Sequence, residues 1–145
     1  MNLFLDCEFN DFGGALISMA LVDKHGHDWY RVLACQNPTP WVAANVMPVL
    51  GEAPVLPMHF KHSLQQYLHP YSAIHVIADW PEDIAHFCQA LIVGPGKRIA
   101  TPPLTMEVRR DLDSSASAIP HNALADAHAI RNQYLQLAAS SEAHR

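Results

Sequence analysis

Two carboxylates stand two residues apart near the N-terminus. Asp6 and Glu8 lie in the segment Leu3–Phe9, where apolar residues alternate in the way that is typical of a strand with one buried face. Their side chains leave the same face of that strand about 7 Å apart, so their charges repel, and a divalent cation bound between them would relieve the repulsion. The simpler alternative is a polar face turned toward water. Phe4 shares the acidic face, which indicates partial cover and favours the metal site.

The start of the last predicted helix carries a second candidate group. Asp126 borders the apolar stripe of this helix, where an acid is costly to bury unless it is paired or bound to a metal. His121 precedes Asp126 by five residues and would reach the same point from the end of the helix, as a base that acts on water without binding metal. The alternative is a helix-capping segment with a solvated histidine. The stripe recurs with helical spacing and consists of Ala123, Ala127, Ile130, Tyr134 and Leu137.

Asp79 and Asp83 form a third candidate group, between a predicted strand over residues 73–78 and a helix that Pro81 opens. Functional groups often collect where a strand ends and a helix begins. Taken singly, each acid has an ordinary structural role, Asp79 as the N-cap of the helix and Asp83 as a favourable charge in its first turn. Their functional interpretation therefore depends on the two other groups.

The elements that must position these side chains are a mixture of strands and helices. Three strands with short loops, over residues 3–9, 15–22 and 29–34, predict an antiparallel meander. A buried strand is expected over 73–78 and a fifth strand over 98–101. Helices are expected over 41–50, 57–68 and 81–91, and after Pro120 until Ser140 and Ser141 let the last one fray. This order predicts an α/β fold.

Length and composition limit the class of protein. The chain has 145 residues, half of them hydrophobic, which predicts one globular domain with its own core. A formal net charge of −5 argues against binding nucleic acid through bulk positive charge, but it leaves room for a nuclease whose acids hold cations. No apolar run approaches the roughly 18 residues of a membrane span, and the N-terminus is unlike a signal peptide. Three widely spaced cysteines form neither a zinc-binding nor a disulfide pattern, and a cytoplasmic location is expected.

Together, the acids and the histidine resemble the DEDDh exonucleases, the DnaQ-like branch of the ribonuclease H-like fold. The family's Asp-x-Glu motif on its first strand looks like Leu5–Phe9, and its His-to-Asp motif on the last helix looks like His121–Ala127. The second motif is the loosest. An ungapped comparison of Val76–Asp83 puts Asp83 where the family has its metal-binding acid and Asp79 where it has Asn. The resemblance covers nearly the whole chain, and it looks closest to a small bacterial exoribonuclease-like subgroup.

The resemblance implies a fold and an activity. The fold would be a single ribonuclease H-like domain over residues 1–145, with a mixed five-stranded sheet (strands 1–3 antiparallel, then strands 4 and 5) flanked by helices. The activity would be that of a 3′–5′ exonuclease which releases 5′-mononucleotides from single-stranded nucleic acid, RNA in preference to DNA, with His121 as general base. Two Mg²⁺ or Mn²⁺ ions per site would be held by Asp6, Glu8, Asp83 and Asp126, with Asp79 as the alternative to Asp83. Substrate contacts would come from Phe9 (where the family often has Thr), Asn10 and Asp79.

Partners and rival functions follow from the small size of the chain. Similar small family members pair, so a two-fold homodimer is expected, in which the exposed aromatics Trp41 and Trp80 help to complete the substrate groove. One rival is a nucleic-acid-binding or assembly protein without cleavage, which the presence of four acids and His121 disfavours. Another is a phosphodiesterase of small nucleotides, which the short chain and the acidic charge favour. Basic side chains that either contact phosphates or lie in solvent are Lys61, Lys97, Arg98, Arg109, Arg110 and Arg131.

Overall fold

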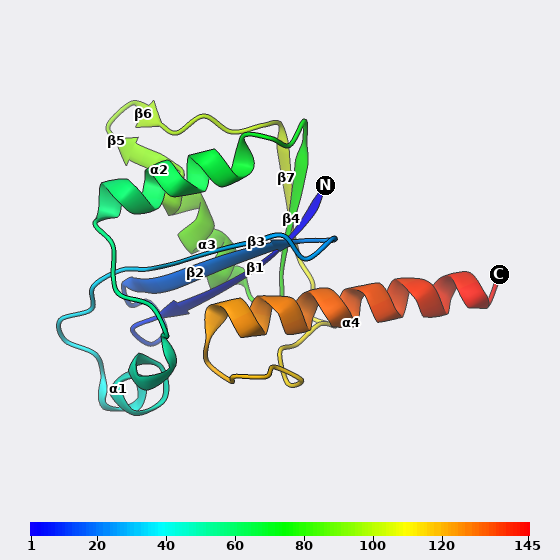
Figure 1. Cartoon of the computed structure of the whole chain (residues 1–145), viewed down its shortest axis with the longest axis horizontal. Coiled ribbons are helices and arrows are strands. Elements are labelled where there is room, and N and C mark those ends of the chain that lie inside the picture. Colours follow the sequence, from blue (N-terminus) through cyan, green and yellow to red (C-terminus); the bar gives the residue numbers. More distant parts are fainter.

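A computed structural model describes all residues, 1–145, and five strands form its main sheet in the order β3-β2-β1-β4-β7 (Figure 1). β1 (Asn2–Phe9), β2 (Leu16–Asp23) and β3 (Asp28–Val32) are antiparallel, whereas β4 (Ile74–Ala78) and β7 (Leu104–Val108) continue the sheet in parallel beyond β1. The predicted α/β fold with a mixed, ribonuclease H-like sheet is confirmed.

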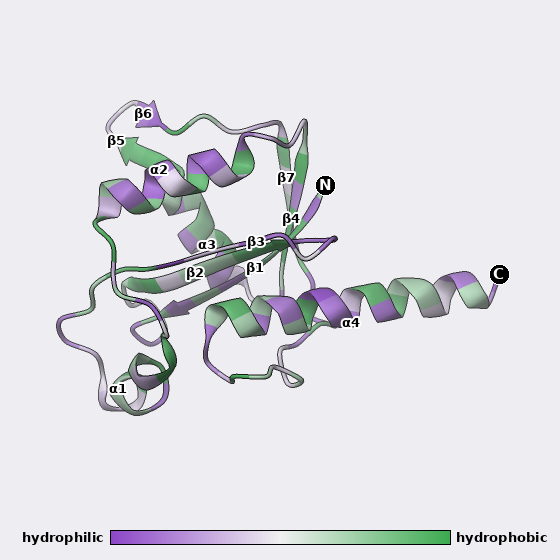
Figure 2. Ribbon diagram, viewed as in Figure 1, coloured by the Kyte–Doolittle hydropathy of each residue, from purple (hydrophilic) through white to green (hydrophobic).

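Helices cover both faces of this sheet. On one face, α2 (Pro57–Leu68) and α3 (Pro81–Ala90) pack on the side chains of Leu3, Leu5 and Cys7. On the other face lie α1 (Pro40–Asn45) and the long α4 (Ala123–Ala143), which runs beyond the sheet at its C-terminal end (Figure 1). Hydrophobic residues line β2 between these two helical layers (Figure 2). None of the helices combines the length and the hydropathy needed to cross a bilayer.

The two helices that carry candidate acids begin in different ways. α3 starts at Pro81, and its N-cap is Trp80, which makes no side-chain capping bond. Asp79 is therefore not the cap of this helix, and its capping interpretation is wrong. α4 is capped by Asn122, whose side-chain oxygen accepts a hydrogen bond from the backbone N–H of Ala125 at 3.0 Å. His121 lies one residue before that cap.

The strand predicted over residues 98–101 is wrong. Lys97–Arg98 form β6, which pairs with β5 (Ile92–Gly94) in a separate two-stranded hairpin, with Gly96 in the turn at φ 69°. The fifth strand of the main sheet is β7, directly after Pro102 and Pro103. Prolines cannot donate to a sheet, but they are tolerated before a strand begins. Here the carbonyl of Pro103 accepts a hydrogen bond from the N–H of Ile74 at 2.9 Å.

Two predicted helix boundaries also need correction. The helix expected over residues 41–50 ends at Asn45 and is followed by a short 3-10 turn, η1 (Met47–Val49), because Pro48 has no N–H to continue the α-helical ladder. The last helix does not fray at Ser140 and Ser141. Their hydroxyls donate to the backbone carbonyls one turn earlier, at 2.9 and 3.0 Å, and the helix continues to Ala143.

Candidate metal centre

β1 positions Asp6 and Glu8 on the face that α4 covers. Across the antiparallel pair, Asp6 lies opposite Ala20 and Glu8 opposite Ser18, so only small side chains flank the acids on that side. Phe4, on the same face of β1, is fully buried in a cluster with Ile130 of α4. The predicted cover of the acidic face is confirmed.

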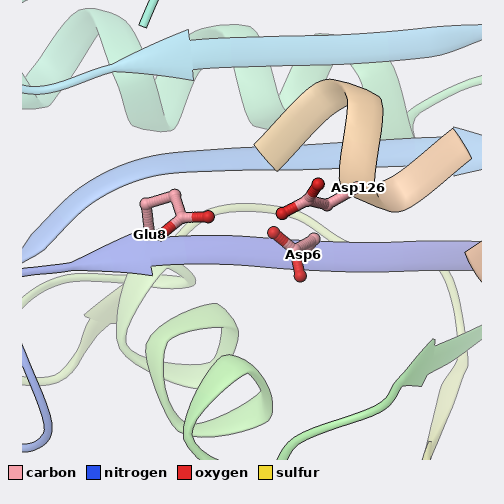
Figure 3. A group of neighbouring side chains, drawn as sticks. All are labelled: Asp6, Glu8 and Asp126. Carbon is pink, nitrogen blue, oxygen red and sulfur yellow. The ribbon is translucent and has the colours of Figure 1, made fainter. Parts of the chain in front are cut away.

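Five carboxylates form two groups that share one member. Asp6, Glu8 and Asp126 each offer an oxygen within 4.8 Å of the others, and their carboxyl groups point toward one another from β1 and α4 (Figure 3). Asp6, Asp79 and Asp83 form a second group by the same measure. Asp6 therefore lies between two acidic clusters, each of which could hold a cation.

The pairing of β1 with β4 explains why both acids of the loosest motif reach Asp6. Phe4 is the partner of Ile77 in this parallel pair, so Asp79 comes level with Asp6 two residues further along each strand. Asp83 approaches from the first turn of α3. Both Asp79 and Asp83 lie near Asp6, and Asp83 is the more buried of the two. Asp83 as the ligand, with Asp79 as its alternative, stays a prediction.

Burial makes these acids hard to ionise. Removal from water, followed by the charge of Asp83, raises the pKa of Asp6 well above its usual value. Burial and the charge of Asp126 raise the pKa of Glu8 to about 8, and burial with the charge of Asp79 raises the pKa of Asp83 to about 8. A group of like charges in this position is stable only when it is protonated or when cations neutralise it.

The carboxylates suit hard divalent cations. One oxygen of Asp6 (Oδ2) and one of Asp126 (Oδ1) are buried without any hydrogen-bond partner. Buried polar atoms normally have partners, so these two are available as ligands. All donors in both clusters are carboxylate oxygens, the ligand type that Mg²⁺ and Mn²⁺ prefer and that zinc sites in proteins use less often.

His121 lies just before the N-terminus of α4, beside this centre, but it belongs to neither cluster. Its backbone has a positive φ of 69°, which turns the chain sharply before Asn122 starts the helix. The ring packs edge-on against Trp41, with ring centres 5.0 Å apart. Burial raises the pKa of Asp126, while the charge of His121 acts in the opposite direction, so the two side chains are close enough to interact.

A hollow of about 420 Å³ opens next to Glu8. Its remaining lining consists of Asp11 and three aromatic residues, Phe9, Phe12 and Trp41. Phe9 also stacks on His86, with ring centres 5.0 Å apart, and this contact holds it in place. The hollow is therefore lined by two carboxylates and three aromatic rings.

The structure gives Asn10 a clear local role. Its side-chain amide donates to the carbonyl of Asn37 at 2.9 Å, and its side-chain oxygen accepts from the N–H of Thr39 at 2.9 Å. These bonds tie the loop after β1 to the start of α1. A contact of Asn10 with substrate stays a prediction.

Phe12 is the residue near this centre that the sequence motifs did not indicate. It is 80% exposed and lies between Phe9 and Trp80, with ring centres at 6.5 and 5.9 Å. The available signal was a large aromatic residue within a glycine-rich turn, where no core position exists to explain it.

Comparison with known proteins finds no protein-family model that matches the chain and no match among the curated proteins. The fold and the acidic clusters therefore carry the functional argument.

Proposed function

We propose that this protein is a metal-dependent 3′–5′ exonuclease that acts on single-stranded nucleic acid, RNA in preference to DNA. The observation that carries the proposal is the shared position of Asp6 between two buried carboxylate clusters on a ribonuclease H-like sheet. Two adjacent cation sites that share one ligand are the arrangement on which two-metal phosphodiester hydrolysis depends.

The acids divide naturally between two cations of the Mg²⁺ or Mn²⁺ type. Glu8 and Asp126 would complete one site with Asp6, and Asp83, with Asp79 as the alternative, would complete the other. When bound, such a pair of ions supplies charge stabilisation on both the attacking and the leaving oxygen of the scissile phosphate. Asp6 orients both sites because it is fixed in a central strand.

His121 would act as the general base. It lies at the end of α4, next to Asp126, and Trp41 holds one edge of its ring. From there it can accept a proton from the water that attacks the phosphate, without being a ligand itself. Its positive φ places His121 in the turn before Asn122, outside the helix itself.

The hollow beside Glu8 would receive the terminal nucleotide. Phe9, Phe12 and Trp41 offer ring surfaces to a base, and stacking on such surfaces accepts every base. The phosphate of that nucleotide would then point toward the acidic clusters. Release of a 5′-mononucleotide follows from this orientation.

A second function, hydrolysis of small nucleotides, is favoured by the same hollow. Its volume of about 420 Å³ is that of a small-molecule pocket, and the chain carries a net charge of −5, which does not attract long polyanions. Substrate length therefore separates the two functions.

The test compares labelled RNA, DNA and a dinucleotide, each with and without Mn²⁺. We expect stepwise shortening of single-stranded RNA from its 3′ end only in the presence of Mn²⁺, and loss of this activity in Asp6→Asn. Cleavage of the dinucleotide alone would establish the second function. Binding of RNA without cleavage in any divalent cation would contradict both and would support a binding protein.

A further inference from the structure

Phe12, Trp80 and Arg110 form a continuous row of exposed side chains at the edge of the acidic clusters, here called the aromatic ledge. The Phe12 and Trp80 rings are 5.9 Å apart, and the guanidinium carbon of Arg110 lies 4.6 Å from the centre of the Trp80 ring. None of these residues is a ligand in either acidic cluster. They come from three different parts of the chain: the turn after β1, the start of α3 and the loop after β7.

Arg110 carries a positive charge that no carboxylate neutralises by a direct ion pair. Its one hydrogen bond is donated by Nη1 to the backbone carbonyl of Asp79, at 2.6 Å. The neighbouring Arg109 is different, because it pairs with Asp111 at 2.5 Å and also lies 3.8 Å from Glu107. Arg109 is thus held in direct ion pairs, whereas the charge of Arg110 acts on Asp79 only at longer range and leaves its guanidinium without a carboxylate in direct contact.

The turn that carries Phe12 is held rigidly. The N–H of Asn10 donates to the carbonyl of Ala15 at 2.9 Å, and the N–H of Gly13 donates to the carboxylate of Glu82 at 2.6 Å. Gly14 passes so close to the carbonyl of Asn10 that a Cβ would lie 1.9 Å from that oxygen. An aromatic side chain that is 80% exposed on such a rigid turn has no role in the core. A ligand surface explains it, because binding would then cost little conformational freedom.

The aromatic ledge and the hollow share Phe12 but have different neighbours. The hollow is lined by Glu8, Asp11 and three aromatic rings, which suits a terminal nucleotide placed next to the acidic clusters. The ledge is open surface on the side of Asp79, where Trp80 is 37% exposed. A chain that continues beyond the scissile phosphate needs an open path of this kind.

We infer that the aromatic ledge binds the nucleotides upstream of the scissile phosphate, with a base on Phe12 and Trp80 and the next phosphate on Arg110. This inference rests on the proposed function and deepens it. It makes the substrate a single strand with a phosphate upstream of the scissile one, because a dinucleotide without a 5′ phosphate has only its scissile phosphate and offers none to Arg110. Guanidinium groups pair well with phosphate oxygens, and exposed aromatic rings stack with bases of any sequence.

Binding of a fluorescent oligoribonucleotide of roughly ten nucleotides, measured by anisotropy with Ca²⁺ in place of Mn²⁺, tests the ledge without cleavage. Arg110→Gln should weaken binding about tenfold, as expected for the loss of one charged hydrogen bond. It should also reduce the slope of log affinity against log salt by about 0.7, the amount for one phosphate contact on a single strand. Trp80→Ala should weaken binding roughly 5- to 100-fold by loss of stacking, with the salt slope unchanged.

Arg109→Gln is the matched control, because it removes the same charge from the neighbouring position. It should leave the affinity and the salt slope of the oligonucleotide unchanged. A salt slope that falls equally in both variants would show a diffuse charge effect and would contradict the ledge.

Turnover with Mn²⁺ separates the inference from the proposed function. In Arg110→Gln, KM for the oligonucleotide should rise about tenfold, while KM for a dinucleotide without a 5′ phosphate should rise much less, because that substrate offers no phosphate to Arg110. Equal effects on both substrates would overturn the ledge and leave the nuclease intact. Absence of cleavage in the wild-type protein would overturn the nuclease itself, and the anisotropy results would then decide whether the ledge binds single strands.

Discussion

Five carboxyl groups lie where each one raises the cost of ionising its neighbours. Burial is the largest cause for Asp6, Glu8 and Asp83, and the charge of a neighbouring acid comes second in each case. The partnerless oxygens of Asp6 and Asp126 add to this cost. The buried acids therefore destabilise the metal-free protein, and a bound cation would offset this cost by neutralising their charges.

The stability of the metal-free protein should therefore decrease as the pH rises through neutrality. An unfolded carboxyl group has a pKa of about 4, whereas the pKa values of Glu8 and Asp83 are about 8 in the folded protein. Between these values the folded state holds protons that the unfolded state has released. The free energy of unfolding should fall from pH 5 to pH 8, by about 1.4 kcal/mol per pH unit for each net proton.

Thermal melts of the metal-free protein across this range would measure the effect, and millimolar Mn²⁺ should remove it at pH 8. Asp6→Asn should flatten the pH dependence and lessen the stabilisation by Mn²⁺. Glu142→Gln, at an exposed acid in the last turn of α4, should change neither. Rising stability between pH 5 and pH 8 without metal would contradict the account.

His121 can be tested without disturbing the turn that it occupies. His121→Asn is the suitable variant, because asparagine tolerates positive φ better than alanine does. Turnover should fall roughly 10²–10⁴-fold, the range for a positioned acid–base group. Stabilisation by Mn²⁺ should be unchanged, since His121 belongs to neither cluster. A parallel loss of metal binding would make His121 a ligand or a support instead of a base.

The roles of Asp79 and Asp83 can be distinguished by replacing each with asparagine, which is neutral and has nearly the same shape. We expect Asp83→Asn to lower activity far more than Asp79→Asn, because Asp83 is buried against Asp6 whereas Asp79 is half-buried beside the cation of Arg110. Titration with Mn²⁺, followed by thermal shift, shows which variant has lost a ligand. The reverse order of effects would assign the ligand to Asp79.

At the scale of elements, strand ends and helix starts converge on one point. β1 carries two acids, Asp79 follows directly after β4, and the first turns of α3 and α4 bring Asp83 and Asp126. The turn after β1 adds Phe12 and is locked by backbone bonds. This turn also depends on Gly14, because a side chain at that position would clash with the carbonyl oxygen of Asn10.

Gly14→Ala tests that turn. A Cβ at this position would meet the carbonyl oxygen of Asn10 at 1.9 Å, so the backbone must shift, at a cost of roughly 1–3 kcal/mol. Gly94→Ala is the control, because a Cβ there meets nothing within 4 Å. Thermal melts should show a lower midpoint for Gly14→Ala only, together with weaker binding of an oligonucleotide as Phe12 moves. Equal stability of the two variants would show that the turn is not rigid.

At the scale of the whole molecule, a five-stranded sheet carries helices on both faces, and β5 and β6 form a small hairpin of their own. A single domain over residues 1–145 stays a prediction. Two surfaces of the molecule are left open. β7 is an edge strand with Met106 and Val108 exposed, and α4 extends past the sheet with Leu137 43% exposed. Edge strands of this kind pair readily with other strands.

The homodimer remains a prediction, and the exposed edge of β7 is one surface on which it can be tested. Light scattering at micromolar concentration should give twice the 16.1 kDa of one chain. Met106→Lys should shift the protein toward the monomer, because a charge on an edge strand opposes pairing. Leu56→Lys, at a position that is 77% exposed elsewhere, should not. A monomeric wild-type protein with full activity would contradict the dimer.

Local periodicity was enough to predict much of this protein from its sequence. The alternation in β1 put Asp6 and Glu8 on one face, and the stripe of α4 put Asp126 beside the packed side. These relations are set by chain geometry over a few residues, so no tertiary contact is needed to see them.

Other relations depended on partners that are distant in the sequence. Asp79 lies beside Asp6 because of the register in which β1 pairs with β4. β7 belongs to the main sheet because it pairs with β4, which is distant from it in the sequence. The aromatic ledge brings together residues 12, 80 and 110, whose spacing carries no periodic signal. Strand pairing and helix packing decide such contacts through interactions between segments, whereas periodicity within a segment reports only which of its sides is buried.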